Sequence, residues 1–197
     1  MVLASGNAGK LREIASMVHP LGWTVLPQSN WNLAAAEEDG ATFIENALIK
    51  ARHAAQQTGL PALADDSGLV VEALAGAPGI FSSRFAGEPA DDQANNRKLL
   101  ELMRAVPPAQ RTAYFYCAMV VLRHAQDAAP LVATGLWHGS IALSPRGSGG
   151  FGYDPLFWVD SHGCTSAELE PDIKNSLSHR GQAMARLMAQ LQSAQCS

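Results

Sequence analysis

Val2-Leu3-Ala4-Ser5-Gly6-Asn7-Ala8-Gly9-Lys10 opens the chain and contains the transition that decides the fold. Its first three residues are apolar and predict a short strand, and the residues after Lys10 repeat apolar side chains at helical spacing. The glycines between these two parts favour a connection in which the backbone comes close to a ligand at the start of a helix. The segment therefore predicts an α/β fold, in which a strand leads directly into a helix.

The same alternation continues along the chain. Apolar spacing predicts helices at residues 11–18, 43–59, 91–103 and 180–191. Strands are predicted at residues 2–4, 23–26, 60–64, 69–74, 112–123 and 156–159, and residues 131–143 are predicted to form one or two strands with a turn near His138-Gly139. Alternating strands and helices followed by a strand-rich middle predict a mixed sheet, with two lobes and a cleft between them. The absence of a linker or repeat predicts one domain over residues 1–197.

The composition excludes several classes of protein. With 47% hydrophobic and 16% charged residues, the chain of 197 residues is typical of a globular domain and not of a disordered tail. Its 14 basic and 18 acidic residues give a net charge of −4, which argues against nucleic acid as a partner. The 3 cysteines are far apart, which disfavours a disulfide framework and a zinc site. No signal peptide or membrane-length apolar run is present, so the sequence predicts a cytoplasmic protein without a membrane partner.

The loop Ser5–Lys10 is a candidate phosphate-binding site. Its glycines, a helix N-terminus and the Lys10 cation are the features that hold phosphate oxygens. The spacing matches neither the P-loop nor the dinucleotide-binding fingerprint. A flexible turn capped by Ser5 or Asn7 is the alternative interpretation.

Two adjacent carboxylates, Asp65 and Asp66, follow an apolar strand. Buried neighbouring carboxylates repel, so they require cations or hydrogen-bond donors nearby. Adjacent residues of a strand point to opposite faces, which predicts different roles: one binds a hard cation or polarises a water, and the other anchors the loop. An ordinary Asx-turn remains the alternative. If the fold brings Glu38 beside Asp66, the two carboxylates would form a Mg²⁺ site; otherwise Glu38 belongs to a solvated acidic loop.

Two later segments could bind a flat, polar ligand. The glycines around Phe151 would let a ring stack on this side chain, although a tight turn with Phe151 in the core is equally consistent with the pattern. His179 and Arg180 could donate hydrogen bonds to the carbonyl edge of a base, or could be exposed residues at a helix start capped by Ser178. Lys50 could extend into solvent or reach the site.

Six segments, taken together and in this order, resemble one family. They are Ser5–Lys10, Thr42–Ala47, Ala64–Leu69, Gly76–Ile80, Gly150–Pro155 and Ser178–Gly181. The chain resembles the inosine triphosphatase (Ham1-like, XTP/dITP diphosphatase) family, and the closeness of the match implies a bacterial member. The resemblance implies a long mixed central sheet flanked by helices, with two lobes around an active-site cleft, in a homodimer. It also implies Mg²⁺-dependent hydrolysis of ITP, dITP and XTP to the monophosphate and pyrophosphate, which removes deaminated purines from the nucleotide pool.

The resemblance also implies roles for individual residues. Asp66 would activate water and bind the metal, with Glu38 as its companion and Asp65 as a further candidate ligand. Lys50 would help to offset the charge of the transition state. The implied substrate contacts are Ser5, Gly6, Asn7, Ala8, Gly9 and Lys10 for the triphosphate, Ser67, the base and sugar pocket Phe151, Gly152, Tyr153 and Asp154, and the nucleotide contacts Lys174, His179 and Arg180.

Two other functions stay open at this point. One is a pyrophosphatase of related shape that acts on modified pyrimidine or methylated nucleotides. The other is a module that binds nucleotides without hydrolysing them, although a protein without catalysis has no need for the costly pair Asp65-Asp66.

Overall fold

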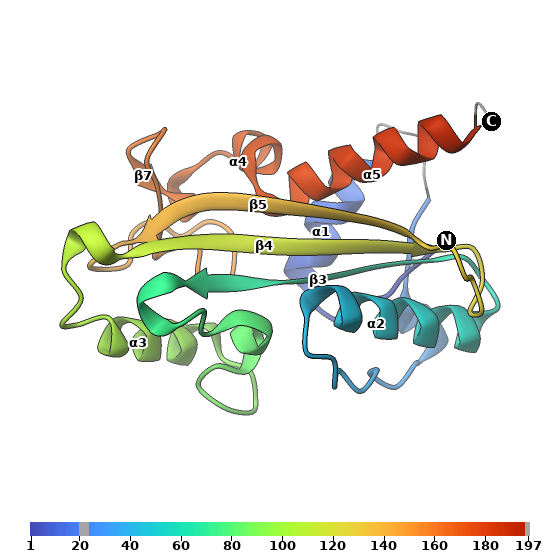
Figure 1. The fold of residues 1–197 in the computed structure, drawn as a ribbon, viewed down its shortest axis with the longest axis horizontal. Coiled ribbons are helices and arrows are strands. Elements are labelled where there is room, and N and C mark those ends of the chain that lie inside the picture. Colours follow the sequence, from blue (N-terminus) through green and yellow to red (C-terminus); the bar gives the residue numbers. More distant parts are fainter. Residues whose placement is uncertain (20–23, 196–197) are drawn as a thin grey trace. The chain divides into compact units, whose positions relative to one another are not determined.

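The computed structural model describes residues 1–19 and 24–195. Its strands form one seven-stranded sheet in the order β2-β1-β3-β4-β5-β6-β7 (Figure 1). The strands are β1 (Val2–Leu3), β2 (Leu26–Pro27), β3 (Ala62–Val71), β4 (Thr112–Leu122), β5 (Leu131–Ile141), β6 (Phe157–Val159) and β7 (Cys164–Thr165). Strand β1 pairs in parallel with β2 and β3, whereas β6 pairs antiparallel with β5 and β7. The predicted mixed α/β sheet is therefore confirmed.

The helices lie between the strands along the chain. They are α1 (Ala8–Val18), α2 (Phe43–Thr58), α3 (Asp92–Leu102), α4 (Pro171–Leu177) and α5 (His179–Gln195). Short 3-10 helices occupy Gln28–Trp31, Glu72–Leu74, Gly79–Arg84, Pro108–Gln110 and Ser166–Glu168. Four of the five α-helices confirm predicted segments within a few residues at each end, and α4 is the one that the apolar pattern did not predict.

The ends of α2 are fixed by local chemistry. The Glu45 N–H donates to Thr42 Oγ1 over 3.2 Å, and the Thr42 N–H donates to Glu45 Oε2 over 2.9 Å, which completes the capping box. Gly59 ends the helix with φ at +68°, a conformation that glycine adopts at little cost. The prediction for this helix is confirmed at both ends.

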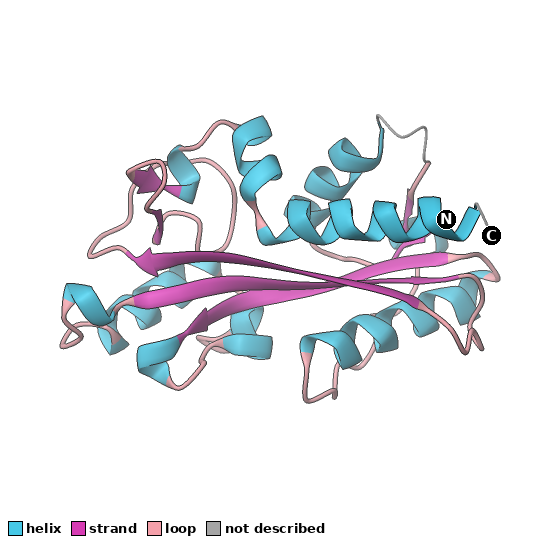
Figure 2. Ribbon diagram, turned by 45° about the horizontal axis from the view of Figure 1, so that its top comes forward, coloured by secondary structure: helices cyan, strands magenta, loops and turns pink. Residues whose placement is uncertain are grey.

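Two predicted interruptions of strands are wrong. Strand β3 runs unbroken through Asp65-Asp66-Ser67-Gly68, so residues 60–64 and 69–74 do not form separate strands and no Asx-turn is present there. Strand β5 continues through His138-Gly139 without a turn (Figure 2). Gly139 is needed for another reason: a Cβ there would lie 2.3 Å from the backbone oxygen of Trp158 on β6. The glycine permits a close approach between strands and does not reverse the chain.

The predicted second strand is also shifted. It spans Leu26–Pro27 instead of residues 23–26, and the predicted start at Trp23 lies outside the described residues. Pro27 was expected to stop the strand, yet it pairs with Leu3. Strand β2 is at the edge of the sheet and has a neighbouring strand on one side only. Proline has no N–H, so Pro27 is tolerated here because no strand on the other side needs this donor.

The chain divides into two compact units, each with its own apolar core. Unit 1 comprises Met1–Asp66, Cys117–Gly135 and His179–Ser197, and unit 2 comprises Ser67–Tyr116 and Leu136–Ser178. The core of unit 1 contains Leu3, Ile14, Val18, Leu63, Cys117, Met119, Val121, Ala133, Ala183, Met184 and Leu187. The core of unit 2 contains Leu69, Val71, Leu99, Met103, Ala113, Phe115, Trp137, Ile141, Tyr153, Leu156, Phe157 and Val159. In unit 1, α1 and α5 lie on one side of the strands and α2 lies on the other (Figures 1 and 2).

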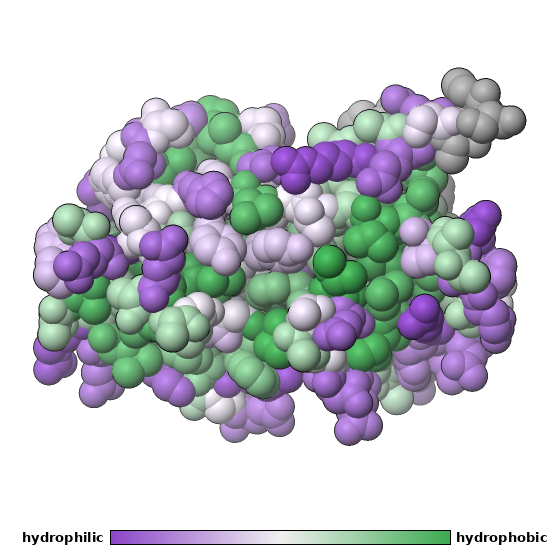
Figure 3. Space-filling model, viewed as in Figure 1, coloured by the Kyte–Doolittle hydropathy of each residue, from purple (hydrophilic) through white to green (hydrophobic). Residues whose placement is uncertain are grey.

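The side of the surface seen in Figure 3 mixes hydrophilic and hydrophobic residues. Hydrophilic side chains follow α5 in unit 1, and apolar side chains are interspersed among polar ones over the rest of that face. Within residues 1–19 and 24–195, no helix combines the length and the apolar character needed to cross a bilayer.

Candidate active site

The loop before α1 is organised by its own polar side chains. The Lys10 N–H donates to Asn7 Oδ1 over 3.0 Å, so Asn7 caps the helix, and the Asn7 N–H donates to Ser5 Oγ over 3.2 Å. Gly6, Asn7 and Ala8 are exposed, which leaves the helix start open to solvent. An open helix N-terminus attracts anions because its N–H groups and its dipole point outward. The loop is therefore both a capped turn and a suitable phosphate site.

Asp65 is fully buried and lies between two cations. Its Oδ2 is 3.0 Å from Lys10 Nζ and 3.6 Å from Arg180 Nε. Burial alone would raise the pKa of the Asp65 carboxyl, but the positive charges of Lys10 and Arg180 hold this pKa well below its usual range. Asp65 is therefore a permanent anion that fixes two cations.

Arg180 is buried to 2% exposure and also forms an ion pair with Glu13 of α1. Burial disfavours the charged guanidinium, yet Asp65 and Glu13 raise the pKa of Arg180 above its ordinary value. Sequence reasoning missed Glu13, although it lies three residues after Lys10 on the same helix. A contact between Arg180 and a base stays a prediction.

Asp66 points to different partners from Asp65. Its Oδ1 accepts from Lys50 Nζ over 2.7 Å and its Oδ2 accepts from Asn46 Nδ2 over 3.5 Å. Lys50 and Asn46 both belong to α2, whereas Lys10 and Arg180 belong to α1 and α5. The predicted division of the two aspartates between opposite faces of the strand is thus visible in their contacts.

Burial raises the pKa of the Asp66 carboxyl above its ordinary value, although the charges of Lys50 and Lys10 act in the opposite direction. A higher pKa makes the ionised carboxylate a stronger base towards a bound water. The pKa values of Asp65 and Asp66 are therefore shifted in opposite directions although the two residues are adjacent in sequence.

One ammonium group is shared between two carboxylates. Lys50 Nζ lies 2.7 Å from Asp66 Oδ1 and 3.2 Å from Glu38 Oε2. Burial lowers the pKa of Lys50, but the charges of Asp66, Asp65 and Glu38 more than offset this effect and raise it. Glu38 of the acidic loop therefore lies near Asp66 of strand β3, which is the arrangement that a metal site at these two carboxylates requires.

The pair Glu38 and Asp66 fits a divalent cation. Both carboxylates already converge on one positive charge, Lys50 Nζ, and carboxylate oxygens are the ligands that Mg²⁺ prefers. In the part of the chain that the structure describes, no group of three or more His, Cys, Asp or Glu side chains could hold a metal. A metal at this pair would therefore depend on oxygens from the substrate and water. Asp65 is the weaker candidate ligand because it already faces Lys10 and Arg180.

Asn46 is the second residue to which the sequence analysis assigned no role, although it lies within the segment Thr42–Ala47. It is 1% exposed, and its Oδ1 accepts from the Gly40 N–H over 2.9 Å while its Nδ2 faces Asp66. Asn46 therefore connects the acidic loop to strand β3. A polar residue on the buried face of α2, one turn before Lys50, was the signal for it.

Unit 2 holds a second buried charge cluster around Asp154. Its Oδ2 accepts from Lys174 Nζ over 2.7 Å and from the Phe151 N–H over 2.8 Å, and its Oδ1 accepts from Ser166 Oγ over 2.9 Å. Gly150 has φ at +73°, and a Cβ there would lie 2.0 Å from Asp154 Oδ2, so the loop requires glycine at this position. Asp154 fixes the glycine-rich loop.

The two aromatic side chains of this loop differ in burial. Phe151 is half-buried and Lys174 Nζ lies 5.1 Å from its ring centroid. Tyr153 is buried and donates from its hydroxyl to the Ser82 oxygen over 2.8 Å. Phe151 is therefore the more accessible aromatic of the segment, whereas Tyr153 belongs to the core.

The predicted site residues fall into two groups, each in one unit. Unit 1 contains Ser5, Gly6, Asn7, Ala8, Gly9, Lys10, Glu38, Lys50, Asp65, Asp66, His179 and Arg180, and unit 2 contains Ser67, Phe151, Gly152, Tyr153, Asp154 and Lys174. The structure joins Lys10, Asp65 and Arg180 in one contact group and Glu38, Lys50 and Asp66 in another. His179 begins α5 and is 5% exposed, and Ser67 is half-buried.

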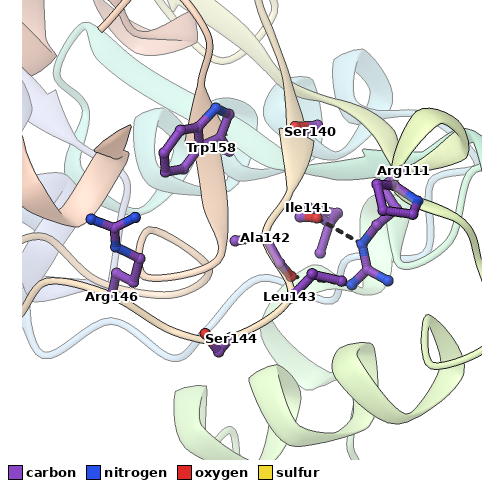
Figure 4. Close-up of a pocket in the computed structure, with 9 residues that line it drawn as sticks. Arg111, Ser140, Ile141, Ala142, Leu143, Ser144, Arg146 and Trp158 are labelled. Carbon is purple, nitrogen blue, oxygen red and sulfur yellow. Dashed lines mark hydrogen bonds between the residues drawn. The ribbon is translucent and has the colours of Figure 1, made fainter. Parts of the chain in front are cut away.

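A cavity of about 300 Å³ in unit 2 contains none of the predicted site residues (Figure 4). It is lined by Pro108, Arg111, Ser140, Ile141, Ala142, Leu143, Ser144, Arg146 and Trp158. Arg111 is 3% exposed and donates to the carbonyl oxygens of Met103, Val106, Ile141 and Ala142. The guanidinium therefore fastens the end of α3 to β5 and is a structural group.

Comparisons with known proteins agree over nearly the whole chain. A family model described as the Ham1 family matches residues 1–190. The dITP/XTP pyrophosphatase of Vibrio parahaemolyticus serotype O3:K6 (strain RIMD 2210633) is 56% identical over 191 residues, which cover 97% of this chain and 96% of that protein. The dITP/XTP pyrophosphatase of Escherichia coli (strain K12) is 55% identical over 188 residues and 95% of each chain. A HAM1 protein from Coxiella burnetii has a similar structure, with a TM-score of 0.89, 50% identity and 98% of each chain covered.

Proposed function

Since the chain belongs to the Ham1 family, we propose that it is a dITP/XTP pyrophosphatase, which hydrolyses dITP, XTP and ITP to the monophosphate and pyrophosphate. The names of relatives at 55–56% identity support the substrate class. The observation that carries the proposal is the pair of adjacent buried carboxylates, of which Asp65 holds two cations and Asp66 has a raised pKa. In this reaction a water attacks the α-phosphorus, the bond from this phosphorus to the bridging oxygen breaks, and pyrophosphate leaves.

Asp66 is the proposed proton acceptor for the attacking water. Burial raises the pKa of its carboxyl, so the ionised form takes up a proton more readily than an exposed aspartate does. Lys50 and Asn46 hold its two oxygens from α2. These contacts orient the base before substrate binds, which is a requirement for efficient general-base catalysis.

The proposed triphosphate site is the loop Ser5–Lys10 at the start of α1. Exposed backbone at Gly6, Asn7 and Ala8 and the Lys10 ammonium provide donors for phosphate oxygens. Asp65 keeps Lys10 in place through their 3.0 Å contact. Fixed positive charge at this position stabilises the charge that develops on the leaving pyrophosphate.

Mg²⁺ is the proposed cofactor, and Glu38 and Asp66 are the residues that would hold it. When bound, the ion supplies positive charge that neutralises phosphate oxygens in the transition state. Lys50 already lies between the same two carboxylates and would share them with the ion.

The base and sugar pocket is proposed to include Phe151, Gly152, Tyr153 and Asp154, with further nucleotide contacts from Ser67, Lys174, His179 and Arg180. The half-buried ring of Phe151 can stack on a purine. Donors that face the O6 atom would accept hypoxanthine and xanthine, whereas the amino group of adenine would leave a donor facing a donor. Such a mismatch in a closed site discriminates by about 10⁴-fold.

We also propose that the enzyme acts as a cytoplasmic homodimer that clears deaminated purine nucleotides before polymerases use them. The activity of the relatives supports this role in the nucleotide pool.

Product analysis with the purified protein tests the function. With Mg²⁺, ITP and XTP should each yield one monophosphate and one pyrophosphate, and GTP and ATP should be poor substrates. The same assay with dUTP and methylated nucleotides distinguishes the other class of pyrophosphatase. Release of orthophosphate, or binding of ITP and XTP without turnover, would contradict the proposal.

A further inference from the structure

Both backbone polar groups of Gly152 are bound by side chains from α3. The Gly152 N–H donates to Asp92 Oδ2 over 2.7 Å, and Asn96 Nδ2 donates to the Gly152 oxygen over 2.8 Å. Asp92 and Asn96 are separated by one helical turn and therefore lie on the same face of α3. They precede Gly152 by 60 and 56 residues, so these are tertiary contacts and not part of a local turn.

Gly152 adopts a backbone conformation that other residues rarely adopt. Its φ is +62°, although a Cβ at this position would meet nothing within 4 Å. The glycine is therefore required by conformation and not by crowding. A glycine backbone is flexible, so partners on both its N–H and its oxygen are needed to keep one conformation.

The residues on each side of Gly152 are fixed by other groups. The Phe151 N–H is bound by Asp154, and the Tyr153 hydroxyl is bound to the Ser82 oxygen. Gly152 is thus the point at which α3 holds the loop, through hydrogen bonds to both the N–H and the oxygen of this residue. Phe151 is the residue directly before this point.

The attachment of α3 to unit 2 uses different residues. Asn95 is 2% exposed, accepts from the Ala86 N–H over 2.7 Å and donates to the Ser83 oxygen over 2.9 Å. Leu99 is buried in the core of the same unit. Since Asn95 and Leu99 anchor the helix, Asp92 and Asn96 are available to act on the loop.

We propose that Asp92 and Asn96 are positioning residues that set the conformation of the loop Gly150–Tyr153 and thereby the affinity and selectivity for the purine base. This inference rests on the proposed function, in which Phe151 and Gly152 line the base pocket. Asp92 makes the stronger contribution because its hydrogen bond is charge-assisted. Neither residue belongs to the proposed catalytic or triphosphate-binding residues, so we expect the chemical step to be independent of them.

Steady-state kinetics of four variants test the proposal. The variants are Asp92→Ala, Asn96→Ala, Asp92→Asn and the matched control Gln93→Ala, an exposed position on the same helical turn. Asp92→Ala should raise KM for ITP about tenfold and leave kcat within about twofold, and Asn96→Ala should raise KM about fivefold. Asp92→Asn retains an oxygen that can accept from the Gly152 N–H, so it should recover most of the loss. Gln93→Ala should match the wild type.

A second readout separates positioning from a general loss of structure. The ratio of kcat/KM for ITP to that for GTP should fall in Asp92→Ala and Asn96→Ala, because a mobile loop discriminates less between bases. Thermal melts of the same proteins report folding. Equal kinetics in Asp92→Ala and Gln93→Ala, or an unchanged ITP to GTP ratio with equal losses on both substrates, would overturn the inference. Failure of the wild type to hydrolyse ITP would instead contradict the proposed function.

Discussion

Two buried lysine–aspartate pairs have the same length but different surroundings. Lys50 Nζ lies 2.7 Å from Asp66 Oδ1 in unit 1, and Lys174 Nζ lies 2.7 Å from Asp154 Oδ2 in unit 2. Lys50 is shared with a second carboxylate, that of Glu38. The comparison shows that the length of an ion pair does not indicate its role; the number and charge of the other partners do.

The surroundings of Asp154 differ from those of Asp66 because its other hydrogen-bond partners are neutral donors. Ser166 and the backbone of Phe151 donate to Asp154, so its charge is stabilised by groups that cannot change protonation near neutral pH. Asp66 lies beside a second acid and is buried, and its pKa is raised. The pair in unit 1 thus contains the acid with the raised pKa, as the proposed proton acceptor requires, whereas Asp154 in unit 2 also binds the backbone of the glycine-rich loop.

The largest expected effect comes from Asp66→Asn. The amide cannot accept a proton from water, so kcat for ITP should fall about 10²–10⁴-fold. The melting temperature should not fall, because the substitution removes a buried carboxylate with a raised pKa. Pyrophosphate release and thermal melts measure both quantities, with the exposed Asp160→Asn as the control. Turnover within tenfold of the wild type would contradict the role of Asp66 as the base.

Asp154→Asn should break the other pair and affect stability first. The substitution removes the negative charge that Lys174 faces and places an amide donor among the donors Ser166 and the Phe151 N–H. Both charged side chains are buried, so the free energy of unfolding should fall by about 3 kcal/mol. Urea denaturation checks this, with the exposed Asp172→Asn as a matched control on α4. Equal stability in the two variants would show that Asp154 does not stabilise the loop.

The smallest effect is a difference in pH dependence between Asp65 and Asp66. The pKa of Asp65 is lowered from 3.8 on folding, so its contribution to stability is present above pH 3.8 and is lost as the pH falls below it. The pKa of Asp66 is raised, so its contribution is complete below 3.8 and is lost as the pH rises through the folded-state pKa. Urea unfolding from about pH 3 to about pH 7 should therefore give wild-type-minus-variant differences with opposite slopes for Asp65→Asn and Asp66→Asn, each on the order of 1 kcal/mol. Slopes of the same sign would mean that the two carboxylates share one environment.

Local chemistry made parts of the fold predictable from sequence. Helix α2 begins at the capping box of Thr42 and Glu45 and ends at Gly59. Each of these end signals involves only residues that are close together in the sequence. The period of two along a strand likewise predicted different partners for Asp65 and Asp66. These predictions needed no knowledge of the rest of the chain.

Long-range contacts made other parts unpredictable. Strand β3 continues through Asp65-Asp66 because cations from α1, α2 and α5 offset the two charges, and no local pattern contains those cations. Gly139 resembled a turn residue, but the nearby oxygen of Trp158 explains it. Glu13 and Asn46 became recognisable as site residues only when their partners Arg180 and Asp66 were placed.

The unbroken strand β3 makes the position of the proposed base depend on whether a residue is at an odd or an even place along the strand. Leu63 is paired with Leu3 of β1, and two and three residues later Asp65 contacts side chains of α1 and α5 and Asp66 contacts side chains of α2. One residue inserted between Leu63 and Asp65 would turn the following side chains to the opposite layer, so that Asp65 would take the place of Asp66 opposite Lys50 and Asn46, and Asp66 would lose both partners. In a mutational scan of this segment, single-residue length changes should therefore be far less tolerated than any single replacement at an apolar position.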